Sequence, residues 1–124
     1  MPRRLLLAAA TALALAVPAV FALGAQADPL ARSARVCNPP AYPGDGYFTS
    51  LTVRRVTCAT GRRVELAYYR CRTRNGPTGH CHHRVLRYRC VEGHRYSDGV
   101  EYDARVTCHR GRRTVIHTYT QNLL

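Results

Sequence analysis

A chain of 124 residues has room for one small domain with a modest hydrophobic core, which excludes a large multidomain enzyme. All 19 basic residues are arginine and only seven acids oppose them, so the formal net charge is +12. This balance predicts attraction to polyanions, namely an acidic wall polymer, nucleic acid or an acidic protein. The exclusive use of arginine also fits a GC-rich coding sequence, in which case the excess charge only serves solubility.

Residues 1–27 have the three parts of a secretory signal peptide. Two arginines form a positive start, an apolar stretch runs from Leu5 to Leu23, and Ala25-Gln26-Ala27 is a small-x-small triplet that signal peptidase accepts. The competing interpretation is a membrane anchor, because the apolar run could nearly span a bilayer, but Pro18 and the triplet favour cleavage. We therefore expect a secreted protein with no transmembrane segment and no lipid anchor in the mature chain.

All six cysteines follow this segment. An even number of cysteines in an exported chain of about 97 residues predicts a disulfide framework of three bridges, each of which typically adds about 2–4 kcal/mol of stability. Six cysteines allow 15 pairings, and the sequence does not choose among them. The predicted disulfide residues are Cys37, Cys58, Cys71, Cys81, Cys90 and Cys108.

The segment 28–46 contains four prolines and two glycines and is predicted to be an irregular arm pinned by Cys37. A single domain is expected over residues 47–124. Its first element is a short strand or extended lead-in from Tyr47 to Val56, where apolar and polar residues alternate in part.

A helix is predicted over residues 57–74, because apolar side chains recur from Val64 at the spacing i, i+3, i+4, i+7. Thr57 is a suitable N-cap. Since Gly61 costs about 1 kcal/mol inside a helix, Thr60 is an alternative, later cap. Asn75-Gly76-Pro77 ends the pattern.

Three further strands are predicted over residues 84–91, 102–109 and 114–120, with a loop over residues 92–101. The last two strands form a hairpin around Arg110-Gly111-Arg112. The expected fold class is α+β, with one helix packed on a small antiparallel sheet of three to four strands and stabilised by disulfides.

Three cysteine-centred segments give the chain a resemblance to known proteins. They are Val56-Thr57-Cys58-Ala59, Tyr88-Arg89-Cys90 and Val106-Thr107-Cys108. With these segments, residues 47–120 resemble a group of small secreted cysteine-bearing proteins of high-GC Gram-positive bacteria, a group without a known activity. The resemblance implies an α+β fold and an exported setting, and it implies no function.

An anion-binding face is the first functional hypothesis. If Leu86, Tyr88 and Cys90 face the helix, then Arg87 and Arg89, together with Arg105 on the next strand, lie on the outer face of the sheet. Arginine holds phosphates and carboxylates through paired hydrogen bonds. The alternative is an ordinary solvated face, because a sheet with one buried side must place polar residues on the other.

A ribonuclease-like hydrolase is the second hypothesis. His109 and His117 lie on the two strands of the predicted hairpin, where they could flank a phosphate as acid and base. The alternative is a pair of surface imidazoles without chemistry. No Gly-x-Ser-x-Gly motif and no glycine-rich phosphate loop is present.

Histidines and a cysteine gather in Gly79-His80-Cys81-His82-His83, with Cys71 ten residues before Cys81. Such residues could hold zinc or copper, but oxidation of the cysteines in an exported domain removes them as ligands. We therefore expect neither a metal nor another cofactor, and leave open whether His80, His82 and His83 bind metal by themselves.

The function expected from the sequence is that of a non-enzymatic exported binding domain with an anionic partner. Besides the hydrolase, the competing class is an inhibitor or toxin-like effector that presents a disulfide-held loop over residues 75–83.

Overall fold

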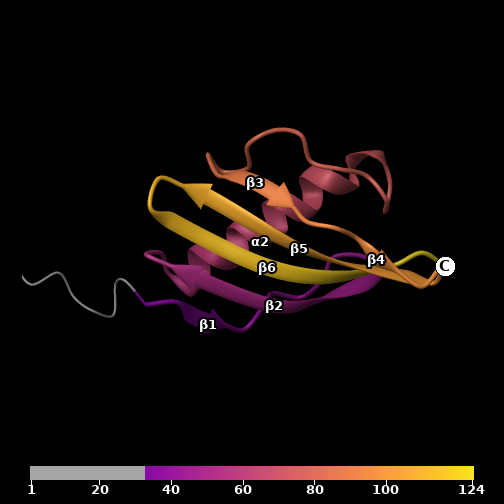
Figure 1. Ribbon diagram of the computed structural model, residues 1–124, viewed down its shortest axis with the longest axis horizontal. Helices are drawn as coiled ribbons and strands as arrows, with labels where there is room; N and C mark the ends of the chain where they lie inside the picture. The colour runs from indigo at the N-terminus through magenta and orange to yellow at the C-terminus, as the bar shows by residue number, and fades with distance from the viewer. Residues whose placement is uncertain (1–32) are drawn as a thin grey trace, which may run out of the picture.

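The structure is a computed structural model that describes residues 33–124, so the predicted signal peptide lies outside the described residues. One helix lies across one face of a six-stranded antiparallel sheet (Figure 1). The sheet order is β1-β2-β6-β5-β3, and β4 also pairs with β5. The elements are β1 (Arg35–Cys37), β2 (Gly46–Arg54), α2 (Cys58–Arg72), the 3-10 turn η1 (Thr73–Asn75), β3 (Arg89–Glu92), β4 (Tyr96–Ser97), β5 (Glu101–Arg110) and β6 (Arg113–Asn122).

The α+β fold class predicted from the sequence is confirmed, but the sheet has six strands rather than three or four. The two additional strands are β1, inside the predicted irregular arm, and β4, inside the predicted loop. Each is too short, at three and two residues, for alternation of apolar and polar side chains to be visible in the sequence. Pairing with the long strands β2 and β5 orders them instead.

The core lies between the sheet and α2. Alternate residues of the three long central strands face the helix and are almost fully buried, among them Val53 of β2, Val106 of β5 and Val115 of β6. Val64 and Tyr68 of the predicted apolar stripe meet them from the helix. The stripe therefore packs against the sheet as the 3.6-residue period requires.

The predicted start of the helix is confirmed in detail. Thr57 is the N-cap, and its Oγ1 accepts a hydrogen bond of 3.2 Å from the backbone N–H of Thr60. Gly61 lies inside the helix because α2 approaches the sheet closely there. A Cβ at this position would be 2.5 Å from Cγ1 of Val53.

The predicted strand over residues 84–91 is shorter in the structure, because residues 85–88 form a tight turn. Two backbone hydrogen bonds of 3.0 and 2.8 Å join Val85 and Tyr88. The two residues between them, Leu86 and Arg87, have φ angles of 46° and 69°. A two-residue hairpin turn with positive φ at both central positions normally uses Asn-Gly or similar pairs, so the sequence Leu-Arg gave no sign of it.

All six cysteines are paired, as the sequence predicts. Cys37–Cys58 ties β1 to the start of α2, Cys71–Cys81 ties the end of α2 to the following loop, and Cys90–Cys108 joins the neighbouring strands β3 and β5. Within residues 33–124, no helix is both long enough and apolar enough to cross a membrane.

Candidate anion-binding site

A pocket of about 580 Å³ opens at the end of the sheet where β2 leads into α2. We call it the arginine pocket, because five arginines line it and none of its lining residues is acidic. The hydroxyl-bearing residues Thr57 and Thr60 also line it. The five arginines are Arg55, Arg63, Arg87, Arg110 and Arg113.

These arginines come from four parts of the fold that meet at one end of the molecule. Arg55 directly follows β2, and Arg63 lies near the start of α2. Arg87 is in the 85–88 turn, while Arg110 and Arg113 face each other across the β5–β6 hairpin. The pocket is therefore a product of the tertiary fold rather than of one sequence motif.

The positive charge of the arginine pocket is not neutralised within residues 33–124. The ion pairs found in this range both involve Glu92, with Arg95 and His80 as its partners. The pocket also adjoins the N-terminal end of α2, where the helix dipole contributes partial positive charge. An anion entering here would meet five guanidinium groups without a competing carboxylate.

Backbone strain is concentrated in the same pocket. Among the described residues, three that are not glycine have positive φ, namely Arg55 at 59°, Leu86 at 46° and Arg87 at 69°. All three line the arginine pocket. The left-handed conformation costs an L-residue about 1–2 kcal/mol, and such strain tends to persist where function requires it.

Relieving this strain should stabilise the protein. We expect Leu86→Asn to raise the free energy of unfolding by about 1 kcal/mol, because asparagine tolerates the left-handed conformation much better than leucine. Leu86 is 45% exposed, so its replacement leaves little cavity behind. Urea denaturation measures the change, with Leu124→Asn, at a position that is 93% exposed, as the control. A loss of stability in the Leu86 variant would show that its side chain is held by packing.

The structure places the three arginines of the predicted outer face on two sides of the sheet. Arg87 lies in the arginine pocket, because the 85–88 turn replaces the predicted strand. Arg89 and Arg105 are exposed on the face away from α2, where Arg89 lies opposite His109 and Arg105 opposite Thr118. The sequence pattern did not predict the pocket's other four arginines. The one feature that could have indicated them is their position at the ends of predicted elements, near Thr57 and Gly111.

The histidine pair of the hydrolase hypothesis is not formed. His117 points toward the helix with no exposed surface, and its neighbours include Phe48 and Tyr68. Burial lowers the pKa of His117 to about 3, with a contribution from Arg72. His109 is exposed on the other face of the sheet. The hypothesis is corrected on this point, because residues on opposite faces cannot flank one phosphate.

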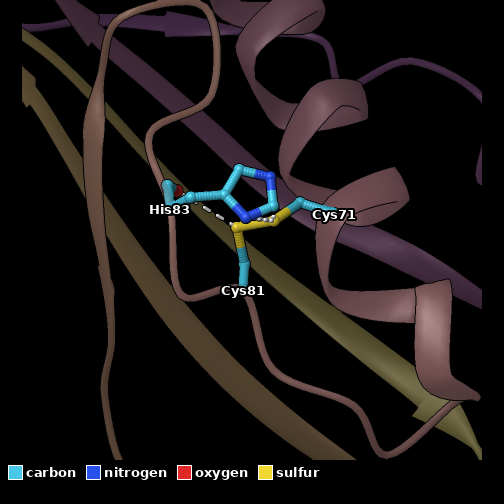
Figure 2. A group of neighbouring side chains, drawn as sticks. All are labelled: Cys71, Cys81 and His83. Atoms are coloured by element: carbon cyan, nitrogen blue, oxygen red, sulfur yellow. Dashed lines mark hydrogen bonds between the residues drawn. A yellow bond between two sulfur atoms is a disulfide. The ribbon is translucent and has the colours of Figure 1, made fainter.

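The cysteine–histidine cluster is shown in Figure 2, where the ring of His83 lies against the Cys71–Cys81 disulfide. Nε2 of His83 is 3.4 Å from Sγ of Cys71. The three potential ligand atoms lie within 4.8 Å of one another. Both sulfurs are bonded to each other, however, and a metal requires the thiolate. His80 and His82 do not join this cluster, and their ring centroids are 6.1 Å apart.

The loop of residues 75–83, the candidate for presentation to a partner, is held firmly at its base. Arg95 donates hydrogen bonds of 2.7 Å to the carbonyl oxygens of Thr78 and Gly79. Arg72 donates one of 2.8 Å to the carbonyl oxygen of Pro77. Together with the Cys71–Cys81 disulfide, these bonds fix the loop to the core.

No family model, curated protein or solved structure matches the chain. The resemblance to secreted proteins of high-GC Gram-positive bacteria therefore stays an expectation. The arginine pocket, with the strained residues that line it, is the candidate functional site.

Proposed function

We propose that this protein is a secreted, disulfide-stabilised binding domain that holds an anionic ligand in the arginine pocket. The observation that carries the proposal is the convergence of five arginines on one pocket without an acidic partner. The predicted signal peptide and the three disulfides support an extracellular setting. Partners of suitable charge there are a wall polymer, nucleic acid or an acidic protein.

The chemistry of the lining favours binding over catalysis. Guanidinium groups donate paired hydrogen bonds to phosphate or carboxylate oxygens, and the hydroxyls of Thr57 and Thr60 add donors. The lining contains no histidine, cysteine or carboxylate that would transfer a proton near neutral pH. The turn at Leu86 and Arg87, closed by two backbone hydrogen bonds between Val85 and Tyr88, forms one wall of the pocket.

The proposal is tested with inorganic tripolyphosphate, a small multivalent anion, by isothermal titration calorimetry at about 50 mM salt. We expect the double variant Arg63→Ala/Arg87→Ala to bind at least tenfold more weakly than the wild type. Each lost hydrogen-bonded charge contact typically contributes about 1.5–3 kcal/mol, so two losses exceed a factor of ten.

The matched control is Arg74→Ala/Arg105→Ala. It removes the same two charges from exposed positions outside the pocket. We expect its affinity to stay within about twofold of the wild type, because long-range attraction is screened by salt. Equal losses in the two double variants would mean that net charge alone attracts the anion, and would overturn the assignment of the site.

A further inference from the structure

Acidic side chains of the described residues gather at one end of the domain. Apart from Glu65 and Glu92, whose side chains are largely buried, every acid of residues 33–124 lies near the end of the sheet where β2 begins and β6 ends. The strand register places Glu101 opposite Asn122 and Asp103 opposite Thr120, while the backbone of Asp45 bonds to that of Asn122. Asp98 bonds to the backbone N–H of Glu101. This acidic end is the right-hand end in Figure 1.

The opposite end, at the β5–β6 turn, carries only positive charge among the residues described. We call it the basic end. Besides the arginine pocket it contains four arginines. Arg35 lies opposite Val53, Arg54 opposite Thr114, Arg89 opposite His109, and Arg112 lies in the hairpin turn itself. Nine arginines thus gather at one end of a domain that keeps its acids at the other.

The basic end continues beyond the pocket onto the second face of the sheet. Arg54 and His109 line a hollow of about 240 Å³ on the face away from α2, together with threonines of β2, β5 and β6. Arg89 lies beside it on β3, paired with His109. The hairpin turn with Arg112 separates this hollow from the arginine pocket, so cations are present on both sides of the same edge.

We propose that the ligand is a linear phosphate polymer that occupies the arginine pocket and passes over the hairpin turn to Arg54 and Arg89. A small anion cannot contact both sides of the sheet at once, whereas a chain of repeated charges can. Five converging guanidinium groups also suit phosphate, which offers more acceptor oxygens than a carboxylate. This inference rests on the proposed function and extends it by naming the ligand class.

No exposed tyrosine or phenylalanine of residues 33–124 lies at the basic end, which favours recognition through the phosphates. Stacking on bases requires exposed aromatic side chains in the binding groove. Tyr88 lines the arginine pocket but is only 2% exposed. The well-exposed tyrosines Tyr47 and Tyr96 lie near the acidic end, opposite Thr120 and Asp103.

The test compares inorganic polyphosphates of increasing chain length as probes. We expect the affinity of the wild type to rise from tripolyphosphate to a long chain by at least tenfold per binding site. The variant Arg54→Ala/Arg89→Ala should keep the wild-type affinity for tripolyphosphate and lose most of this gain. Its plot of log affinity against log salt concentration should flatten by about 0.7 for each lost phosphate contact, or about 1.4 in total.

Two comparisons decide the outcome. Arg74→Ala/Arg105→Ala, with the same loss of charge, should keep both the gain with chain length and the salt dependence. An oligothymidylate with the same number of phosphates should bind no more than a few-fold tighter than polyphosphate. The inference would be overturned if the Arg54→Ala/Arg89→Ala variant kept the gain in affinity with chain length. A preference of tenfold or more for the oligonucleotide would overturn it too. Absence of tripolyphosphate binding by the wild type would instead overturn the proposed function itself.

Discussion

Replacing Glu65 with glutamine is expected to change stability little near pH 5 and to raise the free energy of unfolding by about 4 kcal/mol near pH 8.5. The Glu65 side chain has no exposed surface, and both carboxyl oxygens lack a hydrogen-bond partner among the described residues. Burial therefore raises the pKa of Glu65 to about 8. In the unfolded chain the same carboxyl ionises near pH 4.5.

The direction of this pH dependence follows from the difference in proton binding between the folded and unfolded states. Because the folded protein holds the Glu65 proton more tightly than the unfolded chain does, the contribution of Glu65 to stability is greatest below about pH 4.5 and falls as the pH rises to about 8. Glutamine has nearly the same shape and never ionises, so the variant should lack this decline. Urea unfolding at a series of pH values measures it.

His117 provides an internal control for this experiment. The lowered pKa of His117 confines its effect to the acid side, below about pH 6.5, and it adds nothing between pH 7 and pH 8.5. Any decline of wild-type stability in that range that disappears in Glu65→Gln therefore belongs to Glu65. A Glu65→Gln variant no more stable than the wild type at pH 8.5 would contradict the prediction and show that the carboxylate finds a partner.

The sequence predicts the fold wherever periodicity extends over several residues. The apolar stripe from Val64 and the cap at Thr57 define the helix, and the alternation in β5 and β6 defines the hairpin. Periodicity fails for β1 and β4, whose pairing depends on long neighbours. It also fails for the 85–88 turn, where the bridge between Val85 and Tyr88 encloses Leu86 and Arg87 in a conformation that their own preferences oppose.

The cysteine pairs illustrate the same limit. Cys90 and Cys108 are bonded because the register of β3 and β5 places them directly opposite each other. That register is a property of the whole sheet, so spacing in the sequence does not reveal it. The even number of cysteines predicted three bridges, and only the fold assigns the partners.

The arginine pocket was only partly predictable. The excess of arginine and the expectation of an anionic partner follow from the sequence, but the sequence placed Arg87 on the outer face of a strand rather than in a pocket. The convergence of Arg55, Arg63, Arg110 and Arg113 depends on the short connection from β2 to α2, which brings the helix start beside the hairpin turn. The gathering of the acids at the opposite end becomes visible only when the strands are placed in register.

Glu92, the second enclosed glutamate, is expected to behave in the opposite way to Glu65. Its Oε2 accepts hydrogen bonds of 2.7 Å from the hydroxyls of both Tyr68 and Tyr119, and its Oε1 accepts one of 2.5 Å from Nε of Arg95. Burial alone would raise the pKa of Glu92, but the hydrogen bonds from Arg95, Tyr119 and Tyr68 outweigh it and lower the pKa. The ionised form therefore stabilises the fold above the ordinary pKa, and this stabilisation is lost as the pH falls.

Glu92→Gln should therefore lower the free energy of unfolding by about 3–5 kcal/mol near pH 7, the cost expected when one member of a buried ion pair is removed. Arg95, whose side chain is only 19% exposed, would keep its charge without a counterion, and one amide hydrogen of the glutamine would point at a donor. The deficit should shrink as the pH falls below about 4.5, because the stabilisation by the ionised carboxylate is lost there. The double variant Glu92→Gln/Arg95→Gln separates the two causes, because it removes the unpaired cation and should recover part of the loss. A Glu92→Gln protein as stable as the wild type at pH 7 would contradict the prediction and show that neither the charge of Glu92 nor the hydrogen bond lost in the variant is needed for stability.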